Sequence, residues 1–189
     1  MQNEQIAYLD NFELSLTRNL LAIAHDLRMG GGQLYQSDDL DSVWNDIAPY
    51  YMQDAVPNIP QYPTVSLAWA GYIGMALADI WDKDWSRVQS SDSVYNMLSS
   101  PRGFDRMDEY IVEEILGMPS ESSGAKSIEH LMLSISRAAL DAIRHEQVEP
   151  QSELAFHVYA RSVRAVFRIG ASCQLYLLGY KWQKIAPDH

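Results

Sequence analysis

The sequence predicts an all-α protein, a single domain over residues 1–189 built as a bundle of five to seven helices. Several long segments repeat apolar residues at steps of three and four, and no segment alternates with a period of two for long enough to predict a strand. Proline and glycine fall mainly between these segments. A chain of this length has about the size of one domain and is expected to bury roughly 70% of the surface that the unfolded chain exposes.

Two helices are expected in the first part of the chain. The first runs from about residue 4 to 29, and its apolar seam comprises Ile6, Leu9, Leu16, Leu20, Ile23 and Leu27. Three glycines at residues 30–32 end this helix, and because no Lys-Ser/Thr pair follows them, a phosphate-binding loop is disfavoured. The second helix is expected to begin with Ser37 or Asp38 as its N-cap. Acidic residues follow in its first turn, where the positive end of the helix dipole stabilises them.

A third helix is expected near residues 64–82, at the centre of the bundle. Pro57, Pro60 and Pro63 precede it, and Pro63 can lie in its first turn because the N–H that proline lacks would have no intrahelical partner there. The 15 residues from Thr64 to Ala78 carry no charge, but as a helix they would span only about 22 Å, less than the roughly 30 Å of a bilayer core. A buried helix is therefore predicted, and no membrane span.

Small side chains recur every four residues along this helix, at Ser66, Ala70, Gly74 and Ala78. Such a row forms a groove in which a second helix can pack closely, although it can also leave room for a small ligand. Gly71 and Gly74 each disfavour a helix by about 1 kcal/mol relative to alanine. Close packing of another element against them is the expected compensation.

The rest of the chain predicts one acidic helix and two long helices. Residues 86–103 are rich in serine and predict a loop that holds at most one short helix, at about residues 94–98. An acidic helix follows and ends at Gly117. Long helices are then expected at about residues 126–148 and 151–178, separated by Pro150, and each has one apolar face.

Acidic residues suggest a possible metal site. Asp79 and Asp82 share a helix face, and the acidic helix that follows offers Glu109 and Glu113 at i,i+4. Carboxylate oxygens are the ligands that Mg²⁺ prefers, so these four residues are the candidate ligands for a divalent ion. In the alternative interpretation the acids cap helices or pair with lysine and arginine, and the protein needs no cofactor. We expect no cofactor, with a divalent metal as the alternative.

The last helix carries a basic stripe. His157, Arg161, Arg164 and Arg168 lie on one side of it, and the other side is apolar. Guanidinium groups bind phosphate and carboxylate bidentately, so the stripe is a candidate anion-binding site. Alternatively, the stripe is solvated or ion-paired, with the acidic helix at 105–114 as a candidate partner.

Sequence motifs give little support to catalysis. The chain has no Gly-x-Ser-x-Gly elbow, no His-Glu-x-x-His motif and no repeated Glu-x-x-His motif. Its single cysteine, Cys173, falls on the apolar face of the last helix, where burial would raise the thiol pKa. One cysteine also excludes an intrachain disulfide and fits a reducing compartment. The first residues show no basic and apolar signal pattern, so we expect a cytoplasmic protein.

The formal net charge of −11 and the pI near 4.7 disfavour nucleic acid as a partner, since binding to phosphates depends on lysine and arginine. Residues 1–125 carry a net −13, whereas residues 126–189 carry a net +2. The leading hypothesis is a non-enzymatic module that binds a protein partner or forms a homo-oligomer, with the acidic part providing electrostatic selectivity. The alternatives are a metal-dependent hydrolase of a small phosphorylated substrate and a helical bundle that binds a small ligand.

Overall fold

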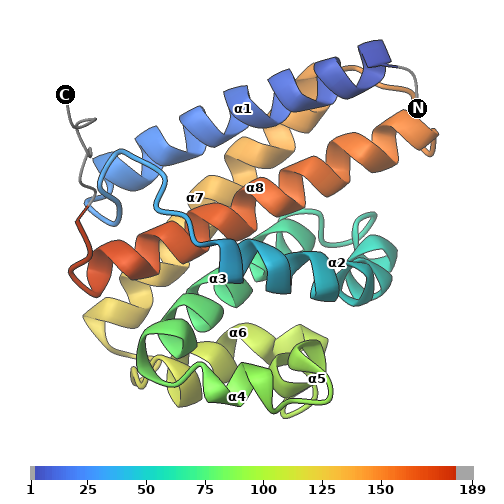
Figure 1. Ribbon diagram of the computed structural model, residues 1–189. Coiled ribbons are helices and arrows are strands. Elements are labelled where there is room, and N and C mark those ends of the chain that lie inside the picture. The colour runs from blue at the N-terminus through green and yellow to red at the C-terminus, as the bar shows by residue number, and fades with distance from the viewer. Residues whose placement is uncertain (1–2, 182–189) are drawn as a thin grey trace, which may run out of the picture.

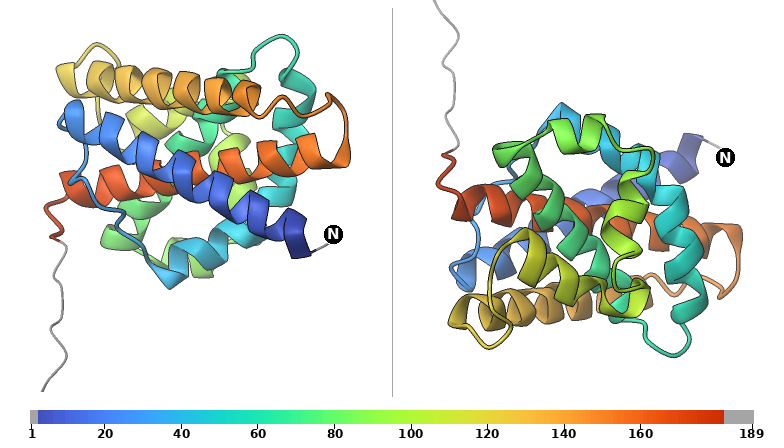
Figure 2. Two further views of the ribbon diagram at one scale, coloured as in Figure 1. Left: turned by 90° about the horizontal axis from the view of Figure 1, so that it is seen from above. Right: turned by 90° about the horizontal axis from the view of Figure 1, so that it is seen from below.

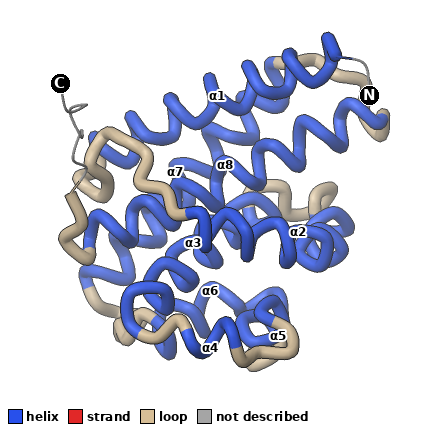
Figure 3. The backbone as a smooth tube through the Cα atoms, viewed as in Figure 1, coloured by secondary structure: helices blue, strands red, loops and turns tan. Residues whose placement is uncertain are grey.

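The computed structural model describes residues 3–181, and their regular secondary structure is entirely helical, with no strand (Figures 1 and 3). The elements, in chain order, are α1 (Asn3–Asp26), α2 (Asp38–Asn58), α3 (Val65–Lys83), α4 (Ser86–Gln89), α5 (Val94–Ser99), a 3₁₀ turn (Phe104–Arg106), α6 (Met107–Tyr110), a π-helical turn (Ile111–Ile115), α7 (Ser123–His145) and α8 (Glu153–Leu177). The predicted all-α class is confirmed. None of these helices is long and apolar enough to cross a membrane.

The eight α-helices of the described residues slightly exceed the predicted five to seven. The excess comes from the region where at most one short helix was expected, because α4 forms there as well as α5. The acidic helix predicted to end at Gly117 is a 3₁₀ turn, α6 and a π-helical turn in succession. Segments of one or two turns carry too few residues to show a helical repeat, so sequence periodicity cannot reveal them.

Helix α3 is the centre of the bundle. Every residue from Ser66 to Ile80 is buried except Trp69, which is half-buried. Helices α8, α7 and α2 and the π-helical turn all contact α3, and the short helices α4 to α6 lie around it when the molecule is viewed from below (Figure 2). On the opposite side α1 lies across α7 and α8 (Figure 1). This burial explains why α3 is apolar on most of its faces.

Helices α3 and α8 cross with their backbones in direct contact. A Cβ atom added to Gly74 would lie 2.1 Å from the carbonyl oxygen of Phe167 and 2.8 Å from the nitrogen of Ala171. A Cβ added to Gly170 would lie 2.0 Å from the carbonyl oxygen of Gly71. No side chain fits at either position, so glycine permits an approach that alanine would prevent. The groove of small residues on α3 is therefore occupied by α8.

Aromatic residues fix α2 and α8 against α3. The hydroxyls of Tyr51 on α2 and Tyr159 on α8 both donate to the carbonyl oxygen of Ser66, each at 2.8 Å. The rings of Trp44 and Phe167 stack with centroids 4.5 Å apart. Buried tyrosines need a partner for the hydroxyl, and here one backbone acceptor serves both. Three helices are thereby fixed relative to one another.

A sharp turn connects α7 to α8. Gln147 and Gln151 adopt left-handed backbone conformations, with φ of 50° and 64°. Ser152 is the N-cap of α8, and its side chain accepts a hydrogen bond from the backbone nitrogen of Ala155 at 3.1 Å. The turn places the first turns of α8 beside the C-terminal end of α2. Residues of both helices therefore line the same surface hollows.

Substituting Gly74 with alanine tests the backbone contact. We expect Gly74→Ala to lower the free energy of unfolding by about 2 kcal/mol or more, because the helices must separate to admit a methyl group, and this outweighs the roughly 1 kcal/mol gain in helix propensity. Gly74→Leu is expected to be worse. Urea denaturation followed by circular dichroism measures the change.

Gly124→Ala in the first turn of α7 is the matched control. Its added Cβ would meet the Met118 side chain, with the sulfur at 3.2 Å, and Oγ of Ser122 at an ordinary 4.0 Å, and the flexible Met118 side chain can move. This variant is expected to be as stable as the wild type or slightly more stable. If Gly74→Ala behaved like Gly124→Ala, the α3–α8 crossing would not be a backbone contact.

Candidate functional site

The three arginines of the basic stripe of α8 converge on one buried carboxylate, that of Glu13 on α1. Arg161 donates to Glu13 from Nη1 to Oε2 at 2.7 Å. Arg164 donates to both carboxylate oxygens, from Nε to Oε1 at 2.6 Å and from Nη2 to Oε2. Arg168 is more distant, with its Nη1 3.7 Å from Oε1. The Glu13 side chain is only 7% exposed, so its charge depends on these arginines.

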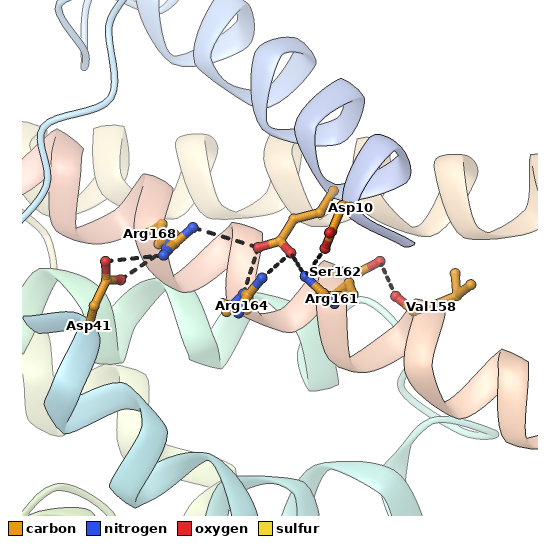
Figure 4. A network of polar contacts seen from close by, with 8 residues as sticks. Asp10, Asp41, Val158, Arg161, Ser162, Arg164 and Arg168 are labelled. Carbon is orange, nitrogen blue, oxygen red and sulfur yellow. Dashed lines mark hydrogen bonds and ion pairs between the residues drawn. The ribbon is translucent and has the colours of Figure 1, made fainter. Parts of the chain in front are cut away.

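Two further carboxylates complete the charge cluster. Arg161 also pairs with Asp10 of α1 at 2.9 Å, and Arg168 binds Asp41 of α2 through two parallel hydrogen bonds of 2.9 and 3.1 Å (Figure 4). Three arginines therefore face three carboxylates, and the formal charges balance. The cluster, here called the Glu13 cluster, joins α8 to α1 and to the first turn of α2.

Opposing effects act on the ionisation of Glu13. Burial alone would raise the pKa of the carboxyl group, but the hydrogen bonds from Arg164 and Arg161 and the charges of the same two arginines outweigh it, so the pKa lies below the ordinary 4.5. Glu13 in turn raises the pKa of Arg164. Both groups are therefore ionised at neutral pH, and the cluster is a network of true ion pairs.

The anion held by the predicted stripe is the chain's own glutamate. The stripe is ion-paired, as one of the two interpretations held, but its partners lie on α1 and α2, and the suggestion that it meets the acidic helix at 105–114 is wrong. His157 stands apart from the cluster, with its Nε2 3.7 Å from Oε1 of Glu153. The guanidinium groups of Arg164 and Arg168 already bind carboxylates. An external anion would therefore have to compete with residues of the same chain.

The four candidate metal ligands do not form one group. Asp79 is buried, with one oxygen 2.7 Å from Nζ of Lys83 and the other accepting from Gln174 at 3.0 Å. Asp82 is exposed and accepts from Tyr180 at 2.7 Å. Glu109 pairs with Arg106 and Glu113 pairs with Arg102, the latter at 2.6 Å. Across residues 3–181 no three His, Cys, Asp or Glu side chains are grouped as metal ligands.

Surface hollows lie between the C-terminal half of α2 and the end of α7 with the start of α8. Two hollows, of about 680 and 700 Å³, meet at Val56 and Phe156, which line both. We call the pair the α2/α8 groove. Its first hollow is lined by residues including Ala48, Pro49, Met52 and Pro57, and its second by residues including Ile59, Ile143, Val148 and Tyr159. Both hollows are predominantly apolar.

Val56 and Phe156 are exposed although they are apolar. The exposed fraction is 37% for Val56 and 50% for Phe156. Full burial along α8 begins only at Val158, and in the first turn of the helix Leu154 is partly buried against the core while Phe156 is exposed. Single exposed apolar residues are ordinary, but two that join a pair of apolar hollows form a continuous surface of the kind used for binding.

Sequence reasoning missed the α2/α8 groove. Phe156 lies at the edge of the apolar face of α8 and repeats with the periodicity of a core residue, so its exposure has no sequence signal. The groove forms because helix ends that are about 100 residues apart in the chain meet, and no local pattern encodes that meeting. Pro57, Pro60 and Pro150, which fall at or near the predicted boundaries between helices, line it, although Pro57 still lies within α2.

Comparison with known proteins provides no relative for this chain. No family model matches the sequence, no curated protein matches it, and no solved structure matches its fold.

Removing the Glu13 charge tests the cluster. We expect Glu13→Gln to lower the free energy of unfolding by about 3 kcal/mol at pH 7, because it leaves partly buried arginines without their shared counter-ion. The loss should shrink as the pH falls below 4.5: the pKa of Glu13 is lowered in the folded state, so its stabilisation is present above the unfolded pKa and is lost as the carboxylate is protonated. Urea denaturation between pH 3 and pH 7 measures both effects.

Asp10→Asn is the control for Glu13→Gln. The Asp10 side chain is 57% exposed and pairs with the same Arg161, so its loss is expected to cost less than about 1 kcal/mol. Equal costs for the two variants would contradict a buried network centred on Glu13.

Cys173 is expected to be chemically inert in the folded protein. Burial raises the pKa of its thiol to about 12, so the thiolate is scarce at neutral pH. Ellman's reagent should therefore label it fully in urea and only slowly without denaturant. Rapid labelling of the native protein would contradict the burial of Cys173.

Proposed function

We propose that this protein is a non-enzymatic interaction module that binds another protein chain through the α2/α8 groove. One observation carries the proposal: Val56 and Phe156 expose apolar surface at the junction of two apolar hollows. Exposed apolar surface that is continuous with hollows is typical of protein interfaces, where aromatic side chains supply much of the binding energy. A location in a reducing compartment such as the cytoplasm belongs to the proposal and is supported by the single buried cysteine.

The arrangement of the charged residues favours an interaction module over a hydrolase. The basic stripe is engaged by Glu13 and Asp41, and Asp79 is engaged by Lys83 and Gln174. A hydrolase of a phosphorylated substrate would need these groups to face a shared cavity. The two hollows of the α2/α8 groove contain neither set of residues.

A small-molecule function is the second candidate. The hollow of about 700 Å³ lies within the size range of ligand pockets, and Arg144 adds a polar group to its apolar lining. The small-residue groove on α3 does not offer this possibility, since α8 occupies it. Native mass spectrometry of the purified protein separates the candidates. A retained small molecule adds a discrete mass to that of the chain, whereas binding of a second copy doubles the mass of the chain.

Photo-cross-linking in cells tests the proposed function. The photoreactive residue p-benzoylphenylalanine is placed at position 156, and at position 14 as a control, because Leu14 is also 50% exposed but lies on α1 and lines neither hollow. We expect one reproducible protein adduct from position 156 and none of that mass from position 14. A second substitution, Val56→Asp, should abolish the adduct by placing a charge in the contact.

Two outcomes would overturn the proposed function. One is the absence of any protein adduct from position 156, and the other is the same set of adducts from both positions. Circular dichroism of each variant confirms that the fold is retained, which is expected because residues 14, 56 and 156 are all exposed.

A further inference from the structure

We propose that the occupant of the α2/α8 groove is an amphipathic helix of a partner protein, with an apolar face that fills the two hollows and with lysine or arginine on its flanks. This inference rests on the proposed function and specifies its partner. It follows from the shape of the groove, from the charges along its two walls and from the net charge of the whole chain.

The α2 wall is acidic, since the part of α2 that lines the groove carries Asp46 and Asp54, of which Asp54 accepts a hydrogen bond from Tyr95. Helix α2 contains five aspartates and no lysine or arginine. Asp41 is neutralised by Arg168 in the Glu13 cluster, whereas Asp46 is exposed, and no ion pair to it occurs within residues 3–181. Asp46 immediately follows Asn45, which lines the first hollow. A partner that covers this hollow therefore approaches an uncompensated negative charge.

The opposite wall is acidic as well. Residues 146–153, which comprise the turn from α7 to α8 and the first residue of α8, contain Glu146, Glu149 and Glu153 and no lysine or arginine. Glu146 accepts a hydrogen bond from Tyr8 on α1, and Glu153 lies 3.7 Å from Nε2 of His157. Glu149 is exposed between the lining residues Val148 and Pro150, and none of the ion pairs of the described chain involves it. One cation lines the second hollow, Arg144, and it already lies 3.5 Å from Asp141. Basic flanks on the partner would thus be attracted from both sides.

The shape of the groove suits a helix. Two apolar hollows meet at Val56 and Phe156, so an occupant needs at least two apolar groups, one in each hollow. An amphipathic helix presents such anchors at i, i+3 or i+4, and i+7, and it leaves its flanks free for charged side chains. The walls are themselves helices, and ridges of side chains on one helix pack into grooves between others.

Net charge disfavours a second copy as the occupant. Each chain carries a formal −11, and two copies joined at acidic rims would repel each other. A small molecule that fills one hollow would leave the acidic rims without a role in recognition. The acidic rims therefore favour a basic protein partner over a second copy of the chain and over a small molecule.

A pair of synthetic peptides tests the inference. Both are designed helices labelled with fluorescein and share one leucine face; one carries lysine on its flanks and the other glutamate. Fluorescence anisotropy is measured with the full chain. We expect the lysine peptide to bind at least about tenfold more tightly than the glutamate peptide, with an affinity that falls as salt is raised.

Two substitutions locate the binding site. Phe156→Ala should weaken binding of the lysine peptide by about tenfold, because an aromatic anchor is lost, whereas Leu14→Ala should not change the affinity for this peptide. Asp46→Asn with Glu149→Gln should reduce the preference for lysine over glutamate. The charge-matched control is Asp92→Asn with Glu121→Gln, since both residues are exposed and neither lines a hollow.

Each adverse outcome overturns a distinct claim. Equal binding of the two peptides, failure of both to bind, or a Phe156→Ala variant that binds like the wild type overturns the inference about the partner. The proposed function stands in these cases if position 156 still cross-links a protein. If the adduct has twice the mass of the chain, the groove binds a second copy, and the inference fails while an interaction module remains.

Discussion

The contact between the backbones of α3 and α8 is the constraint on which the rest of the fold depends. Because Gly71, Gly74 and Gly170 have no side chains, the two helices approach closely enough to bury α3 on nearly every side. Glycine in a helix interior costs about 1 kcal/mol relative to alanine, and the van der Waals attraction between closely packed helices offsets this cost. With one face of α8 held against α3, its opposite face must meet other elements.

That opposite face carries the arginines, and their partners decide where α1 and α2 lie. A buried glutamate is tolerated only where cations satisfy it, so Glu13 fixes the rotation of α1 about its axis. Arg168 holds Asp41 in the first turn of α2 through two hydrogen bonds, and Tyr51 attaches the middle of α2 to α3. The α2 wall of the groove is thereby fixed at two points, by the ion pair with Arg168 and by the hydrogen bond from Tyr51.

Local patterns predicted the long elements and missed what depends on distant contacts. The helix expected at 126–148 is observed at Ser123–His145, and the central helix expected near 64–82 is Val65–Lys83, because periodic apolar residues and flanking prolines are local features. The arginine stripe was also predicted, but its partner Glu13 lies 148 residues away from Arg161 and has no pattern of its own. The groove arises where helix ends meet, which only tertiary packing determines.

The same contacts explain how an apolar surface can remain open on a folded protein. Collapse of the α2/α8 groove would require α2 or the first turns of α8 to move inward. Tyr159 of α8 and Tyr51 of α2 both hold the carbonyl oxygen of Ser66, and moving either helix would break a buried hydrogen bond. The walls are thus held apart, and a binding site formed in advance loses less conformational entropy when a partner enters. Acidic rims would add long-range attraction for the proposed basic partner, on the same surface that these hydrogen bonds keep rigid.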